Sequence, residues 1–205
     1  KHISLVEQAI IREIEKRDVG LVVLTGDIID APFKMDVLGE FCRNLKGERR
    51  TVLATLGNWE HSPRLSINEL GEKYRAHGIR LMVNESAVFD SAISVAATDD
   101  AYAGNAHLEK TLNGFSAATV NLFLTHSPRL LDHIPASARR FDLALAGHTH
   151  GGQCRIGPFV PFRPPYSGRF VSGWYEIPAG RAYVSCGTGT SVFPVRIACR
   201  PELPE

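Results

Sequence analysis

Residues 142–153 read DLALAGHTHGGQ, and in this stretch a short apolar segment, Asp142–Ala146, runs directly into Gly147-His148-Thr149-His150. A continuous apolar segment of this length is typical of a strand that is buried on both faces. The glycines on either side of the histidines allow the backbone to turn sharply. The stretch therefore predicts a buried strand that delivers two histidines at its carboxyl end.

Three other apolar segments end in polar side chains. They are Leu21–Leu24 before Thr25-Gly26-Asp27, Val52–Leu56 before Gly57-Asn58, and Asn121–Thr125 before His126. Taken singly, Asp27 and Asn58 also suit turns, and His126 also suits a helix start before Ser127-Pro128. In α/β sheets, however, ligands bind outside the carboxyl ends of the strands. We therefore expect these side chains to meet His148 at one rim.

Helical periodicity separates these strands. Apolar residues at helical spacing predict helices over residues 3–17, through Val37–Leu45 and through Ile67–Tyr74. Further strands are predicted at Ile93–Ala97 and Ala182–Ser185, and the proline-rich stretch Gly157–Gly173 is predicted to be an irregular loop. This alternation predicts an α/β layered domain, and the crowding of strands in the second half indicates more than one sheet.

Composition narrows the class of protein. The 205 residues suit one domain, and a formal net charge of +1 at pH 7 gives no reason to expect a nucleic-acid partner. No apolar run approaches the roughly 18 residues needed to span a bilayer. The sequence opens at Lys1 almost inside a periodic segment, which we interpret as a fragment boundary. The cysteines lack CxxC spacing, which favours buried or free thiols over two disulfides.

The polar residues at the strand ends form a mixed nitrogen and oxygen ligand set. Imidazole suits Zn and Fe, while carboxylate and carbonyl oxygens suit harder ions such as Mn. A carboxylate can bridge two cations, and two metals about 3.5–4 Å apart are a recurring device for hydrolysing phosphate esters. This set therefore predicts divalent metal binding and phosphoryl chemistry. No HExxH stretch occurs, which argues against a zinc protease.

Gly26-Asp27, Gly57-Asn58, His126 and Gly147-His148-Thr149-His150 together resemble four ordered motifs of the calcineurin-like metallophosphoesterases. The run GHTHGGQ, the proline-rich loop after it and Val184–Ile197 resemble a bacterial branch that is often membrane-associated. That branch includes phosphodiesterases and relatives of UDP-2,3-diacylglucosamine hydrolases. The resemblance covers nearly the whole chain and implies a four-layer αββα sandwich of two mixed β-sheets flanked by helices.

The resemblance also implies a ligand set for two divalent ions (Mn, Zn or Fe). Asp27 would bridge both ions, Asn58, His126 and His148 would complete one site, and His150 would serve the other. In the family, the second site also takes ligands from a DxH motif on the first strand. No DxH occurs in this sequence, so we interpret residues 1–205 as one domain that lacks this first strand.

Trp59 stands where the family usually has a histidine that protonates the leaving group. His61, two residues further on, is a weak catalytic candidate, because it would need a different bend of the loop. Asp99-Asp100 after a predicted strand could line the rim or cap a loop. The implied activity is hydrolysis of phosphodiester or pyrophosphate bonds by metal-activated hydroxide. The alternative, supported by Trp59 and the absent DxH, is a catalytically weak metal-binding or regulatory module.

The Gly157–Gly173 loop contains Phe159, Phe162 and Tyr166 together with Arg163 and Arg169. Aromatic rings beside arginines suit a ligand that is part apolar and part anionic, such as a lipid-linked phosphate. The loop would then form one wall of the substrate cleft, and peripheral membrane association would follow. The alternative is that these rings only pack the loop onto the sheet. We expect a monomer that acts on a small-molecule or lipid-linked phosphate.

Overall fold

The computed structural model describes residues 3–89, 91–115, 118, 120–138 and 141–205. In its first half, helices and strands alternate: α1 (Leu5–Arg17), β1 (Leu21–Leu24), the 3-10 turn η1 (Pro32–Lys34), α2 (Met35–Leu45), β2 (Thr51–Ala54), α3 (Ile67–Ala76) and β3 (Ile79–Leu81). The three strands pair in the order β1-β2-β3, all parallel. Ser4 caps helix α1 and forms a reciprocal capping box with Glu7, which satisfies backbone donors at the helix start.

The second half forms a larger sheet. Its elements are β4 (Glu85–Phe89), β5 (Ile93–Ala97), α4 (Leu108–Asn113), β6 (Val120–Leu124), η2 (Pro128–His133), β7 (Phe141–Ala146), η3 (His150–Gly152), β8 (Gly173–Ile177) and β9 (Gly180–Val184). The strand order is β4-β5-β6-β7-β9-β8; β5, β6, β7 and β9 are parallel, while β4 and β8 pair antiparallel at the edges. The central strands therefore present their carboxyl ends on the same side.

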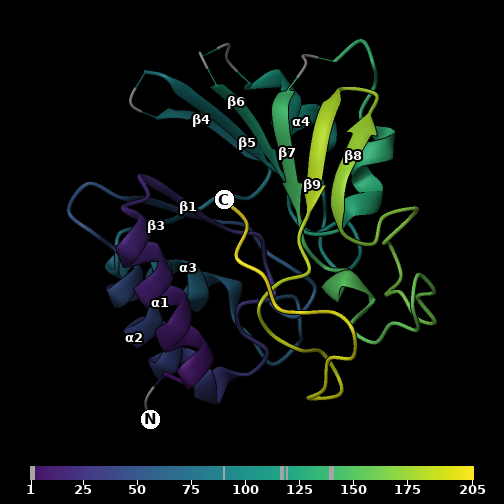
Figure 1. Cartoon of the computed structure of the whole chain (residues 1–205). Helices are drawn as coiled ribbons and strands as arrows, with labels where there is room; N and C mark the ends of the chain where they lie inside the picture. The colour runs from purple at the N-terminus through teal and green to yellow at the C-terminus, as the bar shows by residue number, and fades with distance from the viewer. Residues whose placement is uncertain (1–2, 90, 116–117, 119, 139–140) are drawn as a thin grey trace.

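The two sheets pack face to face between layers of helices and loops (Figure 1). On β1, Val22 and Leu24 are buried beneath α1, α2 and α3, whereas Leu21 and Val23 pack toward the larger sheet, as the alternation of a strand requires. Between the sheets, Leu53 of β2 joins a cluster with residues of β5 and β6. The other face of the larger sheet is covered by α4, η2 and part of the proline-rich loop.

The predicted α/β sandwich is confirmed, with one correction. The smaller sheet is parallel throughout its described strands rather than mixed, because each connection between its strands contains a helix that returns the chain to the same end. The predicted strands lie within two residues of their observed bounds, and residues 157–172 contain no helix or strand. Strands β3, β4 and β8 and helix α4 were not predicted, because they are short or lie half-exposed at an edge.

The structure also bears on the expected absence of membrane spans and on the expected free cysteines. Among the described residues, no helix combines the length and the apolar character needed to cross a membrane. The expected free thiols are also confirmed: Cys42, Cys186 and Cys199 are buried, and Cys154 is half-buried.

Candidate metal centre

Four loops meet where the two sheets face each other. Asp27 and Asn58 follow β1 and β2 of the smaller sheet, and His126 and His148 follow β6 and β7 of the larger one. A side chain at Gly26 would not fit, because a Cβ there would stand 2.7 Å from His126 Nδ1 and would meet the backbone of Gly57. Glycine at this strand end therefore lets the loops of both sheets approach closely.

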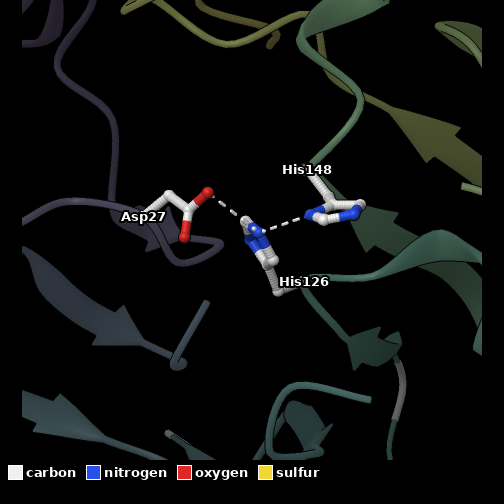
Figure 2. Close-up of side chains that lie close together, drawn as sticks. All are labelled: Asp27, His126 and His148. Carbon is white, nitrogen blue, oxygen red and sulfur yellow. Dashed lines mark hydrogen bonds and ion pairs between the residues drawn. The ribbon is translucent and has the colours of Figure 1, made fainter. Parts of the chain in front are cut away.

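The side-chain atoms of these residues converge on one point, as predicted. His126 Nε2 lies 3.1 Å from His148 Nδ1, and Asn58 Oδ1 lies 3.2 Å and 2.9 Å from the same two nitrogens. Asp27 Oδ2 is 3.2 Å from His126 Nε2, so that the His126 ring stands between Asp27 and His148 (Figure 2). One carboxylate, one amide and two imidazoles thus share a small volume. Asp27, His126 and His148 form a group that could hold a metal ion.

Contacts on the outer side of each imidazole ring orient its inner nitrogen. His126 Nδ1 donates to the Thr25 carbonyl at 2.7 Å, and His148 Nε2 donates to the Pro165 carbonyl at 2.6 Å. Each ring therefore turns its other nitrogen toward the centre, as is usual for metal-binding histidines. Asn58 Oδ1 and Asp27 Oδ2 also point to this centre. Four electron-rich atoms therefore face one another, and a positive charge between them would stabilise the arrangement. The donor set therefore fits a divalent cation.

The pKa directions show the same preference for positive charge. Burial alone would lower the pKa of His126, but the Asp27 carboxylate outweighs it and raises the pKa to about 9. Burial opposes ionisation of Asp27, yet His126 holds the pKa of that carboxyl below its usual value. Without a cation, His126 therefore favours its protonated form, and a bound cation would take the place of that proton.

Glu60 organises the loops beneath this centre, a role that its place in the sequence does not by itself predict. Its buried carboxylate accepts hydrogen bonds from the backbone N–H groups of Asp27 (2.8 Å), Ile28 (2.7 Å), Ile29 (3.1 Å) and Gly57 (2.8 Å). Burial, and then the charge of Asp27, raise the pKa of Glu60, while the backbone N–H groups oppose this shift. One side chain therefore ties the Asp27 loop to the Asn58 loop. A signal was present: an acidic residue two positions after a strand-end Gly-Asn, separated from it by Trp59.

His150 lies beyond this cluster on the turn η3. Its carbonyl oxygen accepts hydrogen bonds from Arg196 and from the Cys199 thiol. Burial lowers the pKa of its imidazole to about 4, against an opposing effect of the Asp27 carboxylate. The next residue, Gly151, is packed so tightly that a Cβ there would stand within 3 Å of both the Cys186 and Cys199 sulfur atoms.

Backbone strain accompanies three of the five predicted ligands. Asp27 (φ 57°), His148 (φ 67°) and His150 (φ 50°) all have left-handed backbone conformations, which non-glycine residues rarely adopt. Such conformations persist only where the surrounding structure enforces them, and they cluster at ligand-binding sites. Here the hydrogen bonds to Glu60, Pro165 and Arg196 supply that constraint.

His61 points into a different set of contacts. Its Nε2 lies 2.6 Å from Asp99 Oδ1, and Asp99 also accepts hydrogen bonds from the backbone N–H groups of Asp100 and Asn105. Asp99 and Asp100 thus cap the loop after β5, the second of the two predicted roles. Trp59 donates its backbone N–H to Asp27 Oδ1 at 2.9 Å and leaves its indole half-exposed at 38%. A catalytic role for His61 stays a prediction.

A sandwich of two sheets with a cluster of Asp, Asn and His at the strand ends is typical of metal-dependent phosphoesterases. Residues 6–152 match the family model for calcineurin-like phosphoesterases, and the chain belongs to this family. The phosphodiesterase YaeI of Escherichia coli is 30% identical over 209 residues, which cover 98% of this chain and 74% of YaeI.

Two Bacillus subtilis proteins are similar over a comparable length. YpbG is 27% identical over 204 residues, covering 98% of this chain and 75% of YpbG. The metallophosphoesterase YkuE is 28% identical over 208 residues, covering 96% and 70%. The predicted kinship with UDP-2,3-diacylglucosamine hydrolases stays a prediction.

Proposed function

We propose that the protein hydrolyses phosphodiester bonds with the help of divalent metal ions held by Asp27, Asn58, His126 and His148. The proposal is carried by the convergence of one carboxylate, one amide and two inward-facing imidazole nitrogens at distances of 2.9–3.2 Å. When bound, such ions lower the pKa of a coordinated water and neutralise charge on the phosphate. The protein's own residues fix the donors before substrate arrives, through Glu60, Thr25 and the Pro165 carbonyl. Mn, Zn and Fe suit this mixed donor set.

We further propose that the protein binds two ions, with Asp27 shared and His150 serving the second ion. Two features support this arrangement. The His150 carbonyl is engaged by Arg196 and the Cys199 thiol, which fixes the turn that carries the imidazole. The Asp27 carboxylate also opposes the fall in the pKa of the His150 imidazole. A shared carboxylate is the usual way to hold two cations a few ångströms apart.

The choice of a diester follows from Trp59. With an indole in place of the family's usual histidine, the chain has no proton donor at that position, so substrates whose leaving group needs little protonation are favoured. We therefore place diesters and pyrophosphates with good leaving groups ahead of alkyl monoesters.

Lipid-linked phosphates are the substrates that the proline-rich loop favours. Phe159 and Phe162 are 63% and 69% exposed, and Arg163 between the prolines is also exposed. The same loop reaches the centre, because its Pro165 carbonyl holds His148. Exposed rings beside a cation suit a ligand with an apolar chain and an anionic head, and they suit peripheral contact with a membrane surface.

Hydrolysis of bis-p-nitrophenyl phosphate with Mn²⁺ tests the proposed activity. His148→Ala should abolish turnover and weaken Mn²⁺ binding measured by calorimetry. His133→Ala, which removes an exposed histidine outside the cluster, should leave both unchanged. Full activity in His148→Ala would overturn the ligand assignment.

The lipid preference has its own test. Phe162→Ala combined with Arg163→Ala should reduce turnover of a lipid phosphodiester far more than turnover of bis-p-nitrophenyl phosphate. An equal loss on both substrates would instead support a packing role for the loop. The competing function, a metal-binding module of weak activity, would show Mn²⁺ binding that depends on His148 without turnover of either substrate.

A further inference from the structure

Two tyrosines from separate loops stand beside the metal centre. The ring of Tyr102, in the loop after β5, has its centroid 6.0 Å from that of His148. The ring of Tyr166, in the proline-rich loop, lies 5.4 Å from that of Tyr102 at an interplanar angle of 40°. Both side chains remain open to solvent, at 45% and 41% exposure. An aromatic surface therefore continues outward from a proposed ligand.

Tyr102 is held in place by a fully buried carboxylate. Asp100 Oδ2 accepts hydrogen bonds from the backbone N–H groups of Tyr102 (3.1 Å) and Ala103 (2.7 Å). Asp100 Oδ1 accepts a hydrogen bond from the hydroxyl of Ser127, the residue directly after His126. The turn that presents the Tyr102 ring is thus fixed to the same loop that carries a ligand of the centre.

Tyr166 is held by a strained backbone. Its φ of 64° is rare for an aromatic residue, and such strain is typical of ligand-binding positions. Contacts on both sides enforce it: the Tyr166 carbonyl accepts a hydrogen bond from Arg129 N–H at 3.0 Å, and the preceding carbonyl, that of Pro165, holds His148. The Arg129 guanidinium also lies over the Tyr166 ring, 5.6 Å from its centroid.

Packing alone does not account for the two rings. Phe170 and Tyr175 of the same region contact each other, Phe170 is fully buried, and the Tyr175 hydroxyl accepts a hydrogen bond from Val171 N–H. By contrast, neither Tyr102 nor Tyr166 has a hydroxyl partner within the part of the chain that the structure describes, and both side chains remain exposed.

We propose that Tyr102 and Tyr166 form a subsite for an apolar group bonded directly to the phosphate. The proposal rests on the proposed function, because the phosphate must sit at the metal centre for its substituent to reach His148 and the tyrosines. Aromatic esters and lipid phosphates both carry such an apolar substituent: an aromatic ring in the first and a hydrocarbon chain in the second. Tyr102 and Tyr166 would then determine which phosphate esters the protein selects.

Phosphonates test the subsite without any reaction, because their carbon–phosphorus bond is not hydrolysed. Binding of methyl-, hexyl- and phenylphosphonate to the Mn²⁺-loaded protein is measured by calorimetry. We expect at least one of the two larger compounds to bind about 10-fold more tightly than methylphosphonate, since aromatic contacts of this kind are worth about a factor of ten. A preference for hexylphosphonate identifies a lipid chain, and a preference for phenylphosphonate identifies an aromatic ester.

Substitutions test whether the two tyrosines cause the preference for the larger phosphonate. Tyr102→Ala and Tyr166→Asn should each remove most of it, asparagine being chosen because it tolerates the left-handed backbone. Tyr102→Phe should retain it, as should Trp174→Ala on the edge strand β8, where the indole is 57% exposed. Thermal unfolding checks that each variant folds.

The outcomes separate the subsite from the proposed function. A wild-type protein without preference, or a preference that survives both tyrosine substitutions, overturns the subsite while leaving the metal centre intact. Failure of all three phosphonates to bind in the presence of Mn²⁺ refutes phosphate binding at the centre, and the subsite with it.

Discussion

Replacing Glu60 with glutamine tests whether one buried carboxylate holds the two ligand-bearing loops together. Oε1 accepts the N–H groups of Ile28 and Ile29, and Oε2 accepts those of Asp27 and Gly57. Glutamine keeps one acceptor oxygen and turns an NH₂ group toward the other pair of donors. Each buried N–H left without a partner costs about 1–3 kcal/mol, so we expect Glu60→Gln to lose about 4 kcal/mol of unfolding free energy.

That loss corresponds to a melting temperature lower by roughly 8–16 °C for a chain of this size. Urea and thermal unfolding followed by circular dichroism measure it directly. Calorimetry should also show Mn²⁺ affinity reduced by about 10–100-fold, because loss of groups that orient ligands has effects of this size. Glu15→Gln, at an exposed position on α1, is the matched control.

A loss below about 1 kcal/mol would refute the reasoning. It would mean that Glu60 is already neutral in the folded protein, the direction in which burial shifts its pKa. A neutral carboxyl, like glutamine, satisfies fewer donors than a carboxylate, and the exchange would then cost little.

Three further predictions concern packing and thiols. Gly151→Ala should lower the free energy of unfolding by about 2–4 kcal/mol, because a Cβ there collides with two sulfur atoms. Gly157 has nearly the same φ but lies in open space, so Gly157→Ala should cost only about 1 kcal/mol. Chemical denaturation of the two variants measures both losses. Burial raises the pKa of the Cys42 thiol from 9.0 to about 12, so its contribution to stability is complete below pH 9 and is lost as the pH rises toward 12. In Cys42→Ala, the free energy of unfolding should fall less steeply between pH 9 and 12 than in the wild type, by about 1.4 kcal/mol per pH unit. Equal slopes in the two proteins would contradict this prediction. Dithionitrobenzoate should react with half-buried Cys154 in the native protein and with the buried thiols only after denaturation.

The rim of the centre could be predicted from sequence because it depends on a local rule. Asp27, Asn58, His126 and His148 each follow a short apolar strand, and the carboxyl ends of parallel strands meet at one edge. The same rule does not tell which strands share a sheet. The pairing of β1 with β2 and of β6 with β7, and the facing of the two sheets, became clear only from the structure.

Other parts of the site depend on contacts between distant residues, which periodicity does not reveal. Glu60 reaches across 31–33 positions to the Asp27 loop. Tyr102 and Tyr166 come from loops that meet only after the larger sheet forms. Cys186 and Cys199 lie against Gly151 without any spacing that would have suggested it.

The origin of the ligands in both sheets has a consequence for the order of folding. Asp27 and Asn58 belong to the smaller sheet and His126 and His148 to the larger one, so neither sheet alone offers more than half of the cluster. A folding intermediate with only one sheet formed would not bind the ion tightly. Metal ions should therefore slow unfolding more than they speed folding, because the interactions they stabilise form only after the sheets have docked.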